Sequence, residues 1–347
     1  MAAFTTPDNK AAWIVAEKQS PLEVKPGPDH KPEANEVVIK VAYAAVNPTD
    51  WRMQDNPYIE LPYPWVFGTD VAGTIVAVGS EATRFNIGQR VIAHCNSLLS
   101  RKVTNAGFQS YSTCDEILVA AVPDSLPLVN AAVLPLSIST AAAGLFGHLN
   151  LPFPTLNPTA SGKTVLIWGG SSSCGSSAIQ LAISAGYKVA TTAGDANHKY
   201  VKDLGADFVF SHSDPKVVEN ILHLFEKEKF GGILDCIADH NTQNLCADIL
   251  SKLGGGVLPT LLWPSQEFPK NVDAKLVMGL DPAFGRRDIG DAVWRNFIPQ
   301  ALAAGKFQAK PDPLLLVGGL EKVQEGINIQ RNGVSAKKVV IEVVATK

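Results

Sequence analysis

The stretch TVLIWGGSSSCGSSAIQLA, residues 164–182, decides the fold. Its apolar residues 165–168 predict a buried strand, the small residues 169–175 predict a tight turn, and the apolar residues that follow recur at helical spacing. Such a turn is a cradle for phosphate, because the helix start offers unpaired N–H groups and small side chains let a pyrophosphate approach. The stretch therefore predicts a dinucleotide cofactor, although Ser172 stands where the usual fingerprint has its middle glycine.

Length and composition are those of an ordinary globular protein. The chain has 347 residues, enough for two domains with separate cores, and it is 46% hydrophobic and 18% charged. A net charge of -3 gives no reason to expect nucleic acid or a membrane as partner. Residues 1–15 contain no long apolar segment, so neither a signal peptide nor a membrane span is expected. Five cysteines without paired spacing predict free thiols and a cytoplasmic location.

Two patterns divide the chain. The first third is rich in β-branched and turn residues and predicts a small antiparallel β domain, with strands at 36–46, 72–79 and 90–94. Helices are expected to begin at 129 and at 138. From residue 163 strands alternate with helices, which predicts a parallel, doubly wound sheet. The strands expected in this sheet are 165–168, 188–192, 208–210, 232–237 and 256–262, and the helices are 176–185, 197–204, 217–227 and 242–253. Two more helices, 292–304 and 320–331, precede a final strand at 338–344, which is expected to pair with the N-terminal β domain.

Three further motifs join the cradle. They are NPTDWR at 47–52, GTDVAGTIVAVG at 68–79 and LSISTAA at 136–142. In this order the four motifs resemble the medium-chain dehydrogenase/reductase superfamily over nearly the whole chain. The segments DCI at 235–237 and GVSAKKV at 333–339 resemble the fungal trans-acting enoyl reductases, which work with polyketide synthases. The resemblance implies an α/β protein with a GroES-like β-barrel catalytic domain (residues 1–128 with 305–347) and a Rossmann cofactor domain (129–304).

The resemblance also allows a prediction about zinc. The alcohol dehydrogenases of this superfamily hold a catalytic zinc, and the matching positions here are Asn47, Thr69 and Leu136, which are poor zinc ligands. Their structural zinc lobe needs four cysteines, whereas only Cys95 and Cys114 lie in that region. A zinc-free enzyme is therefore expected. Reduction of a C=C bond conjugated to a carbonyl suits such an enzyme better than alcohol oxidation, because the developing enolate needs only hydrogen-bond donors.

The type of cofactor depends on the residue at the tip of the second strand of the cradle domain. That residue is Thr192, and a small neutral side chain there leaves room for a 2′-phosphate, whereas a carboxylate would bind the ribose of NAD. NADPH is the cofactor we expect, with Asp195, about 20 residues after the cradle, as the rival that would favour NAD. Lys199 could meet the phosphate, or could simply be a solvated helix residue.

Cofactor contacts are expected from both domains. The cradle is expected to contribute Gly170, Ser171, Ser172, Ser173 and Cys174. The other expected cofactor-binding residues are Asn47, Pro48, Thr49, Asp50, Trp51, Thr192, Gly194, Asn197, Lys199, His212, Thr260, Leu261, Ser335, Ala336 and Lys338. Two alternatives stay open, since Asp50 could instead cap a helix and Lys338 could be a plain lysine at a strand edge.

Catalytic and substrate-binding residues are fewer. Arg52, where relatives often place lysine, and Thr140 are the expected catalytic residues, although Arg52 could form a surface salt bridge and Thr140 could cap a helix. The expected substrate contacts are Ser139, Leu145 and Phe284; Trp65 and Trp294 could complete an apolar pocket or belong to the core. Neither His94 nor Tyr111 lies in a catalytic motif, so the proton for the α-carbon is expected to come from water.

Together these features predict an NADPH-dependent enoyl reductase. It would move a hydride to the β-carbon of an α,β-unsaturated thioester or ketone, presented as a small molecule or on a carrier protein of a polyketide synthase. One alternative is a general quinone or alkenal reductase with the same site. The other is an inactive NADPH-binding scaffold, because function does not follow from fold alone.

Overall fold

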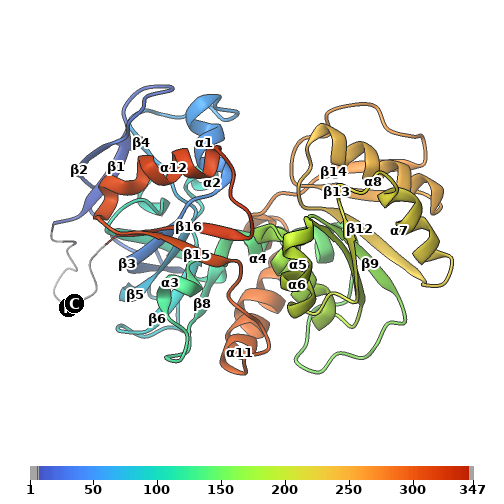
Figure 1. Cartoon of the computed structure of the whole chain (residues 1–347). Coiled ribbons are helices and arrows are strands. Elements are labelled where there is room, and N and C mark those ends of the chain that lie inside the picture. The colour runs from blue at the N-terminus through green and yellow to red at the C-terminus, as the bar shows by residue number, and fades with distance from the viewer. Residues whose placement is uncertain (1–5, 7, 344–347) are drawn as a thin grey trace. The chain divides into compact units, whose positions relative to one another are not determined.

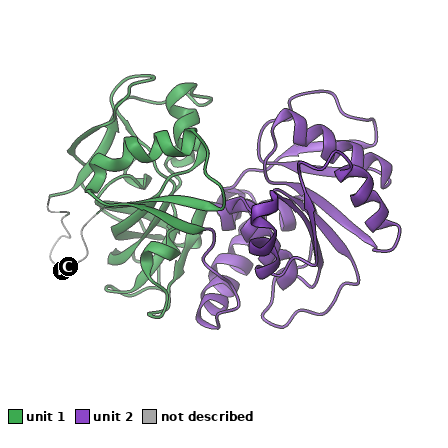
Figure 2. Ribbon diagram, viewed as in Figure 1, with its two compact units in different colours: residues 1–136, 312–347 green, residues 137–311 purple. Residues whose placement is uncertain are grey.

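The computed structural model describes residue 6 and residues 8–343, and the chain divides into two compact units. Unit 1 consists of Met1–Leu136 with Asp312–Lys347, and unit 2 consists of Ser137–Pro311 (Figure 2). The sequence places these boundaries at residues 128 and 305. The structure instead keeps helix α3 (Leu128–Ala131) in unit 1 and returns the chain to that unit at strand β15 (Asp312–Leu316).

Unit 2 contains a six-stranded sheet in the order β11-β10-β9-β12-β13-β14, in which every pair is parallel (Figure 1). The expected parallel, doubly wound sheet is confirmed, and β14 is an additional strand at its edge. The strands are β9 (Thr164–Trp168), β10 (Lys188–Ala193), β11 (Phe208–Ser211), β12 (Phe230–Asp235), β13 (Gly256–Thr260) and β14 (Val272–Leu276). The α-helices that lie wholly within this unit are α5 (Ser173–Ser184), α6 (His198–Asp203), α7 (Val217–Phe225), α8 (His240–Lys252), α9 (Asp281–Phe284), α10 (Arg287–Gly290) and α11 (Ile298–Ala303).

Helix α5 begins three residues earlier than the expected start at residue 176. Ser172 caps it, because its side chain accepts a hydrogen bond from the backbone N–H of Gly175. Two other expected helices contain π-helical turns. α4 (Pro135–Ala142), which begins in unit 1, continues as π-helix over Ala143–His148, and the expected helix at 292–304 is π-helix over Asp291–Phe297 followed by α11.

Unit 1 is mainly β-structure. One sheet follows the order β15-β16-β3-β5-β6-β8, with β7 also paired to β3, and a smaller sheet has the order β2-β1-β4. The expected pairing of the C-terminal strand is confirmed: β16 (Lys337–Glu342) runs antiparallel to β3 (Glu36–Ala45), and Val344 lies outside the described residues. The remaining elements are β1 (Lys10–Ile14), β2 (Glu23–Pro26), α1 (Pro48–Asp55), β4 (Trp65–Val66), β5 (Asp70–Val78), β6 (Arg90–His94), α2 (Ser97–Ser100), β7 (Tyr111–Asp115), β8 (Val119–Ala121) and α12 (Val323–Arg331).

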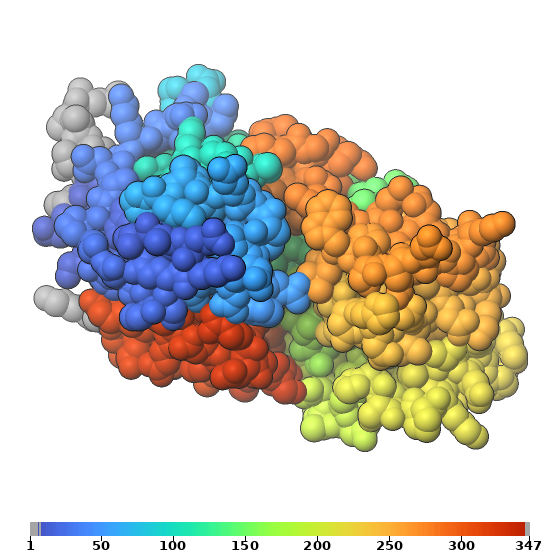
Figure 3. Space-filling model, turned by 90° about the horizontal axis from the view of Figure 1, so that it is seen from above, coloured from blue at the N-terminus to red at the C-terminus, as the bar shows by residue number. Residues whose placement is uncertain are grey.

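The C-terminal helix of unit 1 packs beside its N-terminal part. Figure 3 shows the C-terminal segment in red beside N-terminal residues in blue, and α12 packs against α1. Beneath them lies a core that includes Ile39, Met53, Trp65 and Phe108. A segment from the C-terminal part of the chain therefore completes unit 1.

The core of unit 2 lies between its sheet and helices, with Leu166, Trp168 and Ile249 buried in it. Within the described residues, the helical run Leu128–His148 is long and apolar enough to cross a membrane by length and composition, and 78% of its apolar window is buried inside the protein. Such burial is typical of a core helix. All five cysteines are free thiols in the structure, as expected from their odd number and unpaired spacing.

Candidate active site

Three glycines shape the turn after β9. Gly169 has φ +80, a conformation that L side chains rarely adopt. A Cβ on Gly170 would lie 2.1 Å from Thr191 Oγ1, and a Cβ on Gly175 would lie 2.2 Å from the carbonyl oxygen of Gly169. The turn is therefore folded tightly against β10 and against itself, and it leads directly into α5, at the kind of helix start that binds anions in proteins.

The serines of the cradle have different roles. The Ser172 hydroxyl donates to the Gly169 carbonyl at 2.8 Å and accepts from Gly175 N at 3.0 Å. It is therefore engaged inside the turn, where it replaces a glycine by capping α5. The side chains of Ser171, Ser173 and Cys174 are half-buried beside it. These three remain the cradle side chains expected to face a pyrophosphate.

Other expected cofactor residues gather at the same edge of the sheet, because the carboxyl ends of parallel strands share one edge. Thr192, near the end of β10, is fully buried, and its hydroxyl accepts from Gly169 N at 2.9 Å. Gly194 lies close to His212, whose Nε2 would be 3.4 Å from a Cβ on that glycine. Thr260 and Leu261 lie at the end of β13. The structure thus collects residues from β9, β10, β11 and β13 around the cradle.

The residues considered for binding the ribose or its 2′-phosphate lie just beyond β10. The Asp195 side chain is 78% exposed and lies 3.6 Å from His198 Nε2. Lys199 pairs with Asp203 at 2.7 Å, both side chains being exposed, which is the arrangement of a solvated helix face. Asn197, between them in the sequence, is half-buried.

A second group of expected residues forms a buried network in unit 1. Asn47 Nδ2 donates to Thr69 Oγ1 and to Asp70 Oδ2, each at 2.8 Å. The ammonium of Lys338 lies 3.0 Å from Asp70 Oδ2 and also donates to Asn47 Oδ1. Lys338 is only 3% exposed, so it is not a solvated lysine at a strand edge.

Comparisons with known proteins follow the same division of the chain. Residues 33–124 match the alcohol dehydrogenase GroES-like domain, and residues 174–279 match the zinc-binding dehydrogenase family. The chain is 59% identical over 335 residues to the trans-enoyl reductase himH of Aspergillus japonicus, covering 96% of this chain and 97% of that one. This chain belongs to the medium-chain dehydrogenase/reductase family. The resemblance seen in the sequence, including its fungal enoyl reductase branch, is confirmed.

Two more relatives agree. The dehydrogenase pigH of Monascus ruber is 37% identical over 372 residues, covering 96% of this chain and 99% of that one. The crystal structure of the CurK enoyl reductase has the same fold, with a TM-score of 0.78 at 19% identity, over 97% of this chain and 100% of that one. The expected pairing of a GroES-like domain with a Rossmann domain is therefore confirmed for this medium-chain dehydrogenase/reductase.

The residues of this medium-chain dehydrogenase/reductase do not fit a catalytic zinc. The positions that match the family's ligands, Asn47, Thr69 and Leu136, converge on Asp70 instead: Leu136 N donates to Asp70 Oδ1 at 2.6 Å, and Asn47 binds both Thr69 and Asp70. Neither an amide, a hydroxyl nor a leucine offers the donors that zinc prefers. Among residues 6 and 8–343, no group of three or more His, Cys, Asp or Glu side chains is placed to hold a metal.

Asp50 has the capping role that the sequence left open. Its Oδ2 accepts from Asn47 N at 2.7 Å, at the start of α1, and its Oδ1 accepts from Gly68 N at 3.2 Å. Burial raises the pKa of Asp50 to about 7, against these hydrogen bonds, which lower it. Asp50 therefore ties α1 to the loop before β5.

Asp50 should make the stability of the protein fall as the pH rises. The folded protein holds the proton of the Asp50 carboxyl more tightly than the unfolded chain does. The stabilisation that this protonated carboxyl contributes is therefore fully present below about pH 4 and is lost as the pH rises through about 7, at up to about 1.4 kcal/mol per pH unit. Asp50→Asn should remove that slope, as read from urea unfolding between about pH 4 and about pH 8. Asp124→Asn, at an exposed carboxylate, is the control; equal slopes in wild type and Asp50→Asn would contradict the assignment.

Arg52 and its neighbours lie on α1 and the loop after it. The Arg52 guanidinium stacks over the Trp51 ring, 5.1 Å from its centroid, and Arg52 Nε is buried without a hydrogen-bond partner among the described residues. Thr49 Oγ1 lies 2.5 Å from the hydroxyl of Tyr58, whose pKa is raised by burial. Sequence reasoning missed Tyr58, and the signal was a tyrosine six residues after Arg52 in a proline-rich loop. Pro48 is exposed at the start of α1, and Ser335 and Ala336 lie in the turn before β16, where Ala336 has φ 48.

The expected substrate residues are divided between core and surface. Ser139 is buried and accepts from the Trp294 indole N–H at 2.9 Å, and it lies inside α4 with Thr140, so neither residue caps the helix. Leu145 is fully buried, as are Trp65 and Trp294, whereas Phe284 is exposed. Of these residues, Phe284 has an apolar side chain open to a ligand.

Sequence reasoning missed a set of exposed apolar side chains, which follow strands β12, β13 and β14 of unit 2. Ile237 packs over Gly169, with Cγ1 2.5 Å from where a Cβ of that glycine would lie. Trp263 is 70% exposed and Met278 is 46% exposed. Gln243 Nε2 donates to the carbonyls of Ala238 and Trp263, at 2.8 and 3.1 Å, which ties the loops after β12 and β13 together.

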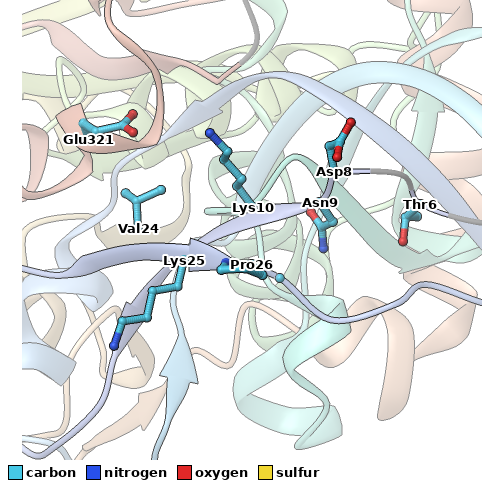
Figure 4. Close-up of a pocket in the computed structure, with 9 residues that line it drawn as sticks. Thr6, Asp8, Asn9, Lys10, Val24, Lys25, Pro26 and Glu321 are labelled. Atoms are coloured by element: carbon cyan, nitrogen blue, oxygen red, sulfur yellow. The ribbon is translucent and has the colours of Figure 1, made fainter.

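A separate surface pocket lies in unit 1 between β1, β2 and Glu321 (Figure 4). It has a volume of about 450 Å³ and is lined by both lysines and carboxylates. None of the expected site residues lines it. The expected site residues lie elsewhere: in unit 2 they gather at the cradle edge, and in unit 1 several of them belong to the Asn47 network.

Proposed function

We propose that this protein is an NADPH-dependent, zinc-independent enoyl reductase of polyketide or other secondary metabolism, acting in the cytoplasm. The observation that carries the proposal is the 59% identity, over nearly the whole chain, to a protein named as a trans-enoyl reductase. The medium-chain dehydrogenase/reductase fold binds a nicotinamide cofactor, and the glycine turn after β9 provides its phosphate cradle.

The choice of NADPH rests on the end of β10. Thr192 is neutral and its side chain is buried, so the residue at the strand tip is not a carboxylate that would repel a 2′-phosphate. At this end of β10, His212 provides a polar side chain and Gly194 is small. When bound, the cofactor supplies a hydride.

The protein's own residues orient the substrate and stabilise charge. As hydride reaches the β-carbon, negative charge develops on the carbonyl oxygen, and hydrogen-bond donors stabilise it. We assign this role to Arg52, whose Nε is buried without a hydrogen-bond partner among the described residues, and to Thr140. The proton for the α-carbon comes from water.

The acyl chain of the substrate is proposed to lie against the apolar side chains at the strand ends of unit 2. Ile237 packs on the cradle, and the large apolar side chains of Trp263, Met278 and, on α9, Phe284 are exposed, so a bound acyl chain could cover them. A chain tethered to a carrier protein of a polyketide synthase would present such an acyl group.

The test is turnover of enoyl thioesters of several chain lengths with NADPH, followed by loss of NADPH absorbance and by mass of the saturated product. We expect turnover, and slower turnover with NADH. Reduction of quinones but not of thioesters would instead identify a general quinone reductase. Tight NADPH binding without turnover of any enone, quinone or aldehyde would identify an inactive scaffold.

A further inference from the structure

The network around Asp70 saturates a fully buried carboxylate. Its Oδ1 accepts from Leu136 N at 2.6 Å, and its Oδ2 accepts from Asn47 Nδ2 at 2.8 Å and lies 3.0 Å from Lys338 Nζ. Asp70 has no exposed surface. An unpaired charge buried to this degree costs several kcal/mol, so the cation beside it is a requirement of the fold.

Lys338 supplies that cation. His94 faces Asp70 from the neighbouring strand β6, but burial lowers the pKa of His94 to about 4 and keeps its ring neutral. Asp50, on the other side, is a carboxyl group and adds no positive charge. The ammonium of Lys338 is thus the charge that balances Asp70.

The ammonium also fixes Asn47. Its hydrogen bond to Asn47 Oδ1 joins residues 291 positions apart in the chain, and it leaves Asn47 Nδ2 directed at Thr69 and Asp70. Asn47 N in turn donates to Asp50, whose other oxygen accepts from Gly68 N. A continuous chain of hydrogen bonds therefore runs from β16 through Asn47 to the first turn of α1 and the loop before β5.

We propose that Lys338 is a positioning residue that holds Asn47, Asp70 and the first turn of α1. Its ammonium contacts Asn47 Oδ1 and Asp70 Oδ2, and Asp70 Oδ1 accepts from Leu136 N. One buried cation therefore ties together three segments of unit 1 that are far apart in the sequence. The inference rests on the proposed function in one respect, which is that α1 carries residues expected to contact the cofactor.

The experiment separates positioning from simple charge balance. Lys338→Met removes the charge and the donor to Asn47, while Lys338→Met combined with Asp70→Asn removes both charges and still lacks that donor. Lys337→Met is the matched control, because Lys337 is an exposed neighbour paired with Asp312 at 3.6 Å. Each full-length variant is measured by urea unfolding, by amide hydrogen exchange of the peptide covering residues 47–55, and by turnover of an enoyl thioester with NADPH.

We expect Lys338→Met to destabilise the protein, to speed exchange in residues 47–55 and to lower kcat about 100-fold, the cost of a misplacement of about 1 Å. The double variant should regain stability, yet keep the fast exchange and the low kcat. Lys337→Met should behave as wild type.

Wild-type exchange in the double variant, or in Lys338→Met itself, would overturn the proposal and leave Lys338 as a charge-balancing residue. If the wild-type protein reduces no enoyl thioester, the proposed function fails. The exchange comparison then still decides the role of Lys338, since it needs no turnover.

Discussion

Gly175→Ala is expected to abolish NADPH binding and to lower the free energy of unfolding by about 2 kcal/mol. The added Cβ would lie 2.2 Å from the Gly169 carbonyl oxygen and 2.7 Å from Gly170 Cα, and both are backbone atoms that cannot turn aside. The first turn of α5 must then move away from the cradle. The N–H groups that would bind the pyrophosphate lose their common direction.

Binding is measured by titrating NADPH fluorescence, and stability by urea unfolding. Gly147→Ala is the control in the same unit, because its Cβ would meet only Ile289 Cδ1 at 3.4 Å. That variant should bind NADPH as wild type does. Undiminished binding by Gly175→Ala would show that the cofactor does not use this cradle.

Asp235→Ala is expected to lower the free energy of unfolding by about 3 kcal/mol and to weaken NADPH binding about tenfold. Asp235 is fully buried at the end of β12, and its Oδ1 accepts from Ile237 N and Ala238 N at 3.0 and 2.9 Å. Its Oδ2 accepts from the Thr242 hydroxyl at 2.8 Å. Alanine would leave the two backbone N–H groups without these acceptors and the Thr242 hydroxyl with only the Asp239 carbonyl at 3.3 Å, and it would release Ile237 from its place over Gly169.

Asp235→Asn is the matched control. The amide oxygen can keep both backbone hydrogen bonds, and the Thr242 hydroxyl can rotate to accept from the amide nitrogen. Since burial raises the pKa of Asp235, the loss of its charge is not costly, and the change should stay within about 1 kcal/mol. Equal destabilisation by Ala and Asn would show that the charge, and not the hydrogen-bond geometry, holds this loop.

Periodicity predicted most of unit 2 but not its edge. Strand β9 is a fully buried apolar run, and β12 contains the buried apolar residues Ile233 and Leu234; such runs are recognisable wherever they occur. β14 was missed because its sequence VDAKL carries Asp273 and Lys275, which alternate with half-buried residues at an open edge. Met278 was missed with it, since its place at the cradle edge follows from that strand.

The start of α5 shows how a local signal can be misjudged. Three consecutive serines have modest helix propensity, so the sequence favours a helix start at residue 176. The structure starts α5 at Ser173, because the Ser172 side chain caps it and the Gly170 and Gly175 contacts hold the turn closed. The substitution of the middle glycine by Ser172 is therefore a cap within the cradle.

The sequence by itself determined the strand, turn and helix of the cradle, the parallel sheet and the family, because each depends on residues close together in the chain or on motifs in fixed order. Only the tertiary structure decided the role of Lys338. Its partners Asn47 and Asp70 reach it through the antiparallel pairing of β16 with β3 and of β3 with β5. Whether a lysine is a solvated edge residue or a buried cation depends on that long-range pairing, which removes water from both charges and leaves them to each other.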